Sequence, residues 1–223
     1  MPSHTWTASS RSRRRGLTPG PPPSWTPPAS RSRRRRIERL IHVVHFSGRV
    51  NALASERIRE TCLHAVRDGA TEIWLHFASG GGQTIYGFTL YNFLRSLPVP
   101  LVMHNLSNVE SISVVVFLAG EIRRVCPQGR FLIHPLNWSF EAGQVDDARL
   151  REYVRKLDND IERYAEIFDA RTAGARQAVA VRDHLSGRER LISAAASLEA
   201  GIAHEVAEAS IPEGAITWSV STQ

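Results

Sequence analysis

The sequence predicts an α/β protein with a mainly parallel sheet, repeated strand and helix units, and one long projecting helix. Three observations lead to this prediction. From residue 37 onward, short apolar runs alternate with amphipathic stretches, a pattern typical of strands joined by helical crossovers. Hydrophobic residues make up 42% of the 223, which is enough for a sizeable core. Residues 146–172 carry a single apolar stripe on an otherwise charged segment.

The first elements follow from the spacing of apolar residues. Residues 40–46 form an apolar run of strand length, and residues 53–69 place apolar side chains on one helical face before a glycine ends the helix. Residues 71–78 predict a second strand, which runs into a turn at Gly80–Gly82. A strand, a helix and a strand in this order predict a right-handed crossover and a parallel pair.

The same alternation continues through the middle of the chain. Apolar residues at helical intervals over 85–93 predict a helix that Pro98 stops. A third strand at 100–106, an apolar helix at 111–120 and a strand at 131–134 follow. These units extend the predicted parallel sheet and place helices against it.

The segment 146–172 predicts a long amphipathic helix that begins at Asp146 and Asp147, where negative charge suits the helix dipole. A helix of roughly 25 residues is about 38 Å long, more than a domain of this size needs. We therefore expect it to project and pack against a partner subunit. Its stripe consists of Leu150, Tyr153, Val154, Leu157, Ile161, Tyr164, Ala165 and Phe168.

Residues 1–36 differ in composition from the rest. They hold nine of the 28 basic residues and no acidic one, which leaves 19 basic against 22 acidic residues in the remainder. Arginine repulsion and the shortage of aliphatic residues predict a disordered Arg/Pro-rich tail at 1–36 and a folded domain at 37–223. The prolines argue against a signal peptide and against a helical transit peptide. Polyanion binding by the tail remains an alternative, but a nucleic-acid partner is not expected of the mildly acidic domain.

Several classes of protein are not expected. Cys62 and Cys126 have neither CxxC nor Cys/His metal spacing, so no disulfide framework or zinc module is predicted, and a reducing, cytoplasmic location suits them. The longest apolar stretch, 112–120, is too short to span a bilayer. The sequence contains neither an ATP-binding motif nor a set of metal ligands, and we expect no cofactor.

Three polar positions follow predicted strands in an order that suggests chemistry. One strand runs into Ser79 and the glycines, another leads to Ser111 at the start of an apolar helix, and His134 closes a third. Ligands of open α/β sheets bind at such strand ends. Taken singly, Ser111 could be only a helix N-cap and His134 only a core histidine. Structural or surface roles are expected for the strand histidines His42, His45, His76 and His104.

Together, these segments resemble the proteolytic subunit family of Clp proteases, within the Clp/crotonase fold of repeated β-β-α units. The resemblance extends from about Ile41 to Val206. It rests on four motifs in the family's order: the glycine turn Ala78–Gly82 with Gly87, the segment from Ser111 to Ala119-Gly120, the segment from Cys126 to Pro135, and the late motif from Ile192-Ser193-Ala194 to Ile202.

The resemblance implies a role for each matching residue. Ser111 matches the nucleophile and His134 the base that takes its proton. The backbone N–H groups of Gly81 and Ile112 match the oxyanion hole. Glu189 stands at the position we match to the family's triad aspartate.

Three features leave alternatives open, and the last two of them depart from the family pattern. Asp183 lies close enough in the sequence to compete with Glu189 for the acid's role. Glu110 puts a carboxylate beside Ser111, where it disfavours a developing oxyanion unless it points to solvent. Gly80 replaces a proline and loosens the turn.

The implied function is that of a serine endopeptidase that cleaves unfolded polypeptides or peptides inside an oligomeric chamber. In the family, two stacked heptameric rings form the chamber, and a separate Clp-type ATPase unfoldase feeds it. A catalytically reduced structural ring subunit is one alternative. A crotonase-like acyl-CoA enzyme is another, although the ordered Ser111 and His134 pair favours a peptidase.

Overall fold

The computed structural model of the protein describes residues 39–139 and 143–221. Residues Glu38–Gln223 form one compact unit. The predicted tail, residues 1–36, lies outside the described residues, so its disorder stays a prediction.

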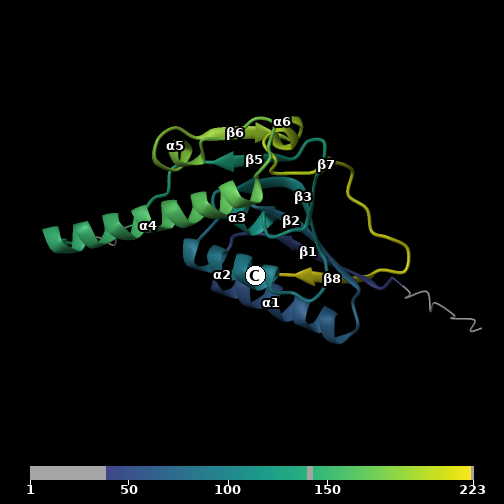
Figure 1. The fold of residues 1–223 in the computed structure, drawn as a ribbon. Helices are drawn as coiled ribbons and strands as arrows, with labels where there is room; N and C mark the ends of the chain where they lie inside the picture. Colours follow the sequence, from purple (N-terminus) through teal and green to yellow (C-terminus); the bar gives the residue numbers. More distant parts are fainter. Residues whose placement is uncertain (1–38, 140–142, 222–223) are drawn as a thin grey trace, which may run out of the picture. The chain divides into compact units, whose positions relative to one another are not determined.

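One eight-stranded sheet organises this unit, with the order β6-β5-β3-β2-β1-β8, while β4 pairs with β3 and β7 (Figure 1). All described pairs are parallel except β5 with β6, so the predicted α/β fold with a mainly parallel sheet is confirmed. The strands are β1 Ile41–Ser47, β2 Glu72–Ser79, β3 Leu101–Glu110, β4 Ile122–Val125, β5 Arg130–Ile133, β6 Arg190–Ser193, β7 Glu205–Val206 and β8 Ile216–Val220.

The first four helices begin close to where the sequence predicts them, whereas the last two, which are short, were not predicted. The helices are α1 Ala52–Arg67, α2 Thr84–Arg95, α3 Ile112–Phe117, α4 Asp147–Arg171, α5 Val181–Ser186 and α6 Ala194–Glu199. The Asp146 carboxylate caps α4 by accepting a 2.8 Å hydrogen bond from the Arg149 N–H. The helix α2 ends at Arg95, before Pro98 as predicted, whereas α3 covers only 112–117 of the predicted 111–120.

The strand β3 is longer than the predicted 100–106 because it forks. Its first half pairs with β4 and its last three residues, Asn108–Glu110, pair with β5. The buried Asn105 lies at the fork, where its backbone carbonyl accepts from the Cys126 N–H and its Nδ2 donates to the Arg130 carbonyl. The second pairing carries the strand on to Ser111.

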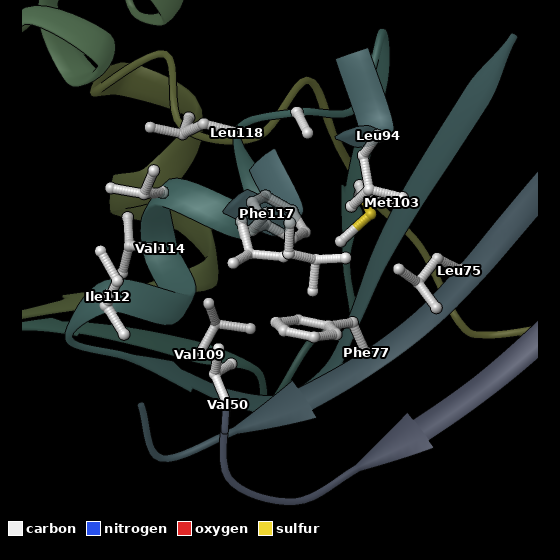
Figure 2. Close-up of a cluster of buried hydrophobic side chains, with 14 of the residues drawn as sticks. Val50, Leu75, Phe77, Leu94, Met103, Val109, Ile112, Val114, Phe117 and Leu118 are labelled. Carbon is white, nitrogen blue, oxygen red and sulfur yellow. The ribbon is translucent and has the colours of Figure 1, made fainter. Parts of the chain in front are cut away.

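The main hydrophobic core lies between the sheet and the helices α1, α2, α3 and the C-terminal half of α4. Figure 2 shows its centre, where side chains from β2, β3 and α3 meet. Because side chains alternate along a strand, the neighbours of these residues face the other side of the sheet. There Ile41, Val43, Trp74 and Val102 form a second, smaller cluster with Ala215.

Only the C-terminal half of α4 is buried, through Tyr164, Ala165 and Phe168. Its N-terminal half extends away from the sheet (Figure 1), with Leu150 46% and Val154 56% exposed. The predicted projecting helix is therefore confirmed, whereas its packing against a partner stays a prediction. Over residues 39–139 and 143–221, no helix has both the length and the apolar character that a membrane span requires.

Candidate active site

The three polar segments singled out in the sequence meet at one edge of the sheet. Because β2, β3 and β5 are parallel neighbours, their carboxyl ends lie together. Gly81 follows β2, Ser111 follows β3, and His134 follows β5. His134 lies one residue beyond the strand that it was predicted to close, since β5 ends at Ile133.

Ser111 occupies a strained backbone conformation between β3 and α3. Its φ of 56° and ψ of −134° make it the one non-glycine residue with positive φ in the described part of the chain. Such a conformation costs about 1–3 kcal/mol and persists only where surrounding contacts hold it. The Ser111 hydroxyl makes no capping bond to α3, so the N-cap alternative is not supported.

The contacts that hold Ser111 come from three elements. Its N–H donates a 2.8 Å hydrogen bond to the Leu132 carbonyl of β5, and its carbonyl accepts one of 3.2 Å from the Tyr164 hydroxyl of α4. Figure 2 shows that Val109, two residues before Ser111, and Ile112, the residue after it, both point into the core. The strained turn is therefore tied to the sheet, the long helix and the core.

Gly81 approaches Ser111 so closely that a side chain has no room there. A Cβ built on Gly81 would lie 2.7 Å from the Ser111 Cβ and 3.4 Å from its Oγ. Gly81 also has a φ of +91°, which favours glycine. The glycine turn thus brings backbone N–H groups next to the candidate nucleophile, as an oxyanion hole requires.

The two N–H groups assigned to the oxyanion hole differ in their present partners. The Gly81 N–H donates a long 3.3 Å bond to Ser79 Oγ, and that same oxygen accepts a 2.7 Å bond from Ser113 Oγ. The Ile112 N–H begins α3 and has no acceptor among residues 39–139 and 143–221. A substrate oxyanion would displace a weak bond at Gly81 and none at Ile112.

His134 is half-buried, and its Nδ1 lies 2.9 Å from the Pro135 carbonyl oxygen. Since a carbonyl only accepts, this bond places the proton on Nδ1 and leaves Nε2 as an acceptor. That is the tautomer that a general base needs. Within the described residues, no hydrogen bond joins His134 to Ser111, so the structure brings the pair to one edge without joining them.

The two candidate acids lie in different surroundings. The last pair of the antiparallel β5–β6 ladder is Ile133 with Arg190, so its continuation would place His134 opposite Glu189. Asp183 lies in the first turn of α5. Both side chains are exposed, and neither makes a described hydrogen bond to His134.

Glu110 is partly buried and turns back along β3. Its Oε1 accepts a 3.0 Å hydrogen bond from Asn108 Nδ2, and its Oε2 would lie 3.8 Å from a Cβ on Gly80. The carboxylate is therefore directed at the glycine turn, and no hydrogen bond connects it with the start of α3. This places a negative charge near the candidate oxyanion hole.

Sequence reasoning missed two supports of this site. Tyr164 was interpreted only as part of the apolar stripe, yet its fully buried hydroxyl holds the Ser111 carbonyl. Burial raises the pKa of the Tyr164 hydroxyl, so it remains a donor. The second missed support is Ser113, whose hydroxyl makes a buried hydrogen bond. A serine inside an otherwise apolar six-residue helix could have indicated such a bond from the sequence.

Three of the four strand histidines form a row on one face of the sheet, because His45, His76 and His104 are partners in register. Burial, together with the neighbouring His45 and His104, lowers the pKa of His76 to about 4. Cys126 lies 3.6 Å from His104 Nε2, and both cysteines are free and buried. In the chain outside 1–38, 140–142 and 222–223, no three metal-ligating side chains are grouped so as to hold an ion.

Known proteins resemble this chain in sequence pattern and in fold. A sequence model of the Clp protease family matches residues 34–210. Among solved structures, a mutant of ClpP1 from Listeria monocytogenes is similar, with a TM-score of 0.61 and 21% sequence identity over 75% of this chain and 91% of that chain. At 21% sequence identity, this match supports the fold alone. No curated protein sequence matches the chain significantly.

Proposed function

The chain belongs to the Clp protease family, and from this premise we propose that it is a serine endopeptidase acting on unfolded polypeptides or peptides. The observation that carries the proposal is the strained Ser111 turn pressed against Gly81. A strained residue at a strand end is the kind of backbone outlier that marks functional sites. A serine with only a packing role would have no need of it.

In the proposed mechanism, Ser111 Oγ attacks the scissile carbonyl carbon while His134 Nε2 takes its proton. The carbonyl oxygen becomes an oxyanion, which accepts hydrogen bonds from the N–H groups of Gly81 and Ile112. His134 then returns the proton to the leaving amine, and water hydrolyses the acyl-enzyme by the same route.

The third member of the triad is proposed to be Glu189, which would accept the Nδ1 proton of His134. The strand register supports this assignment, since Glu189 continues the β5–β6 ladder opposite His134. In the described conformation the Pro135 carbonyl occupies Nδ1. Activity through Glu189 therefore requires the imidazole to exchange one acceptor for the other.

We further propose that the enzyme works as a ring, as other members of its family imply. The exposed stripe of α4, with Leu150 and Val154, supports a subunit contact there. Two stacked heptamers, a Clp-type ATPase partner and a cytoplasmic location are parts of the same proposal. Residues 1–36 are proposed to be dispensable, so a chain that starts at Ile37 should keep its assembly and activity.

Labelling with a fluorophosphonate probe tests the proposal. The probe should modify Ser111 in the wild type and lose that reaction in His134→Ala, because an unassisted hydroxyl is a poor nucleophile. Labelling spread evenly over other serines would contradict it. If the assembled protein is not labelled, the result would favour the alternative of a structural ring subunit. The absence of a hydrogen bond between Ser111 and His134 in the described residues is the observation that supports this alternative. Acyl-CoA turnover that survives Ser111→Ala would favour the crotonase-like alternative.

A further inference from the structure

A groove of about 900 Å³ opens beside the glycine turn. One wall is formed by Arg49 and the start of α2, and another by one face of α4. The lining residues that matter for its charge and polarity include Arg49, Ile85, Trp138, Arg155, Lys156 and Arg163.

The groove is lined by the continuations of two segments that carry candidate site residues. Gly82 follows Gly81, the residue that abuts Ser111, and Asn137–Ser139 come shortly after His134. A polypeptide with its scissile carbonyl at Ser111 would therefore place a neighbouring side chain in this groove. Glu110 is not among the lining residues, so its charge does not face the groove.

The charges that line the groove are unequal. Four cationic side chains face two carboxylates, and both carboxylates are already engaged. Asp160 accepts a 2.6 Å hydrogen bond from the Thr84 hydroxyl and pairs with Arg163 at 3.2 Å. Glu152 pairs with Lys156 at 2.6 Å.

Two cations remain without such neutralisation. Arg49 and Arg155 are exposed, and neither has an ion-pair partner within 4.0 Å among the described residues. An arginine that has no carboxylate partner can take one from a ligand, often through two parallel hydrogen bonds. The groove therefore has room and charge for a carboxylate.

The groove also offers apolar surface. Ile85 is 64% exposed and Trp138 is 38% exposed, and both line it. The methylene groups of a glutamate could pack on such surface while its carboxylate reaches an arginine. A lysine or arginine side chain of a substrate would meet like charges in the same place.

We propose that this groove selects polypeptide substrates with an acidic side chain, glutamate above all, close to the scissile bond. This inference rests on the proposed peptidase function and adds a substrate class to it. The selectivity comes from Arg49 and Arg155, which act on substrate binding and are not among the residues assigned to bond breaking.

The test uses the full chain and fluorogenic peptides that differ at one residue, which is Glu, Gln or Lys. The Glu peptide should have the highest kcat/KM and the Lys peptide the lowest, through KM more than kcat. Each exposed cation should raise kcat/KM for the Glu peptide relative to the Gln peptide by roughly two- to fivefold. The preference should shrink at about 1 M salt, where screening acts within ~3 Å.

The variant Arg49→Gln with Arg155→Gln should bring the Glu and Gln peptides to nearly equal kcat/KM. Its matched control is Arg151→Gln, which removes an exposed arginine from the same helix, paired with Asp147 and outside the groove. That control should keep the preference. If the double variant and the Arg151→Gln control lose the preference for the Glu peptide equally, the inference is overturned, because the preference would then depend only on net charge.

Two further outcomes separate the inference from the function on which it rests. Cleavage of all three peptides at equal efficiency would overturn the inference and leave the peptidase standing. Absence of cleavage together with absence of Ser111 labelling would count against the peptidase function. Fluorescence anisotropy of peptide binding to Ser111→Ala would then test the groove separately. Tighter binding of the Glu peptide would support the inference, and equal binding of the three peptides would overturn it. A change of assembled mass in the double variant with an unchanged KM would make the groove a subunit contact and also overturn the inference.

Discussion

Ser113 donates a 2.7 Å hydrogen bond to the hydroxyl of Ser79, and both side chains are buried directly behind the glycine turn. Ser79 in turn accepts from the Gly81 N–H. The two serines thus connect α3 to the backbone group proposed to hold the oxyanion.

Replacing Ser113 with alanine removes this support. Ser113→Ala should lower the free energy of unfolding by about 1 kcal/mol, as expected for one lost buried hydrogen bond, and should also slow peptide cleavage. Denaturant titration and kcat measure the two effects. The control is Ser55→Ala, because the buried Ser55 hydroxyl has no described partner and its removal should not destabilise the fold. Equal losses in both variants would mean that Ser113 acts through packing alone.

Substitution of Gly81 should abolish reactivity at Ser111. Gly81→Ala would place a Cβ 2.7 Å from the Ser111 Cβ, so one backbone segment must move. Fluorophosphonate labelling measures the result. Gly174→Ala is the matched control: Gly174 also has positive φ, at +87°, but a Cβ there meets nothing within 4 Å. Gly174→Ala should lower the free energy of unfolding by about 1 kcal/mol through backbone strain and leave the labelling of Ser111 intact. Labelling of Ser111 that survives Gly81→Ala would contradict the proposed site.

The third triad member can be identified by comparing two substitutions. Glu189→Gln should lower turnover by up to ~10⁴-fold, the scale of lost triad orientation, while Asp183→Asn changes it little. The opposite ranking would transfer the role to Asp183. Two silent variants would indicate that the Pro135 carbonyl alone holds the His134 tautomer, or that the subunit is inactive. Glu189→Asp should show whether the backbone is adapted to the longer side chain.

The exposed half of α4 should control assembly. Leu150→Asp with Val154→Asp should yield smaller particles in light scattering, with little change in unfolding, because both side chains are exposed. Phe168→Ala is the contrasting variant: this fully buried ring should cost about 3–5 kcal/mol of stability. Leu157 and Ile161, which the sequence stripe also includes, are half-buried and would mix the two effects. A wild type that stays monomeric at all concentrations would refute ring assembly.

The buried histidines should make the fold sensitive to acid. The pKa of His76 falls from 6.5 to about 4 on folding, so below pH 6.5 the unfolded chain binds a proton that the folded chain refuses. The stabilisation is complete above pH 6.5 and is lost as pH falls toward 4. His76→Gln should therefore reduce the loss of unfolding free energy between about pH 7 and pH 5. An identical pH dependence in wild type and His76→Gln would contradict this account.

Periodicity and composition were sufficient to predict the fold class. The alternation of apolar runs and amphipathic stretches predicted β1, β2, β3 and β5 with the helices between them, because these elements bury their faces in a pattern that the chain carries locally. The stripe over 146–172 predicted α4 to within a residue at each end. The short strands β4, β6, β7 and β8 were not predicted, since strands of two to five residues depend on partners far along the chain.

The order of residue types likewise placed Ser111, His134 and Gly81 as candidates, and parallel pairing brings them to one edge. Only the tertiary structure could decide how they are held. Two contacts of Ser111 join segments that lie tens of residues apart: the hydrogen bond from Tyr164 to its carbonyl and the close approach of Gly81. These contacts hold Ser111 at its strained φ. The charge of the groove likewise arises only when Arg49 and Arg155 are folded to the same place. Local sequence determines which face of an element is buried, whereas a site depends on distances between elements, and those are set by the packing of the whole core.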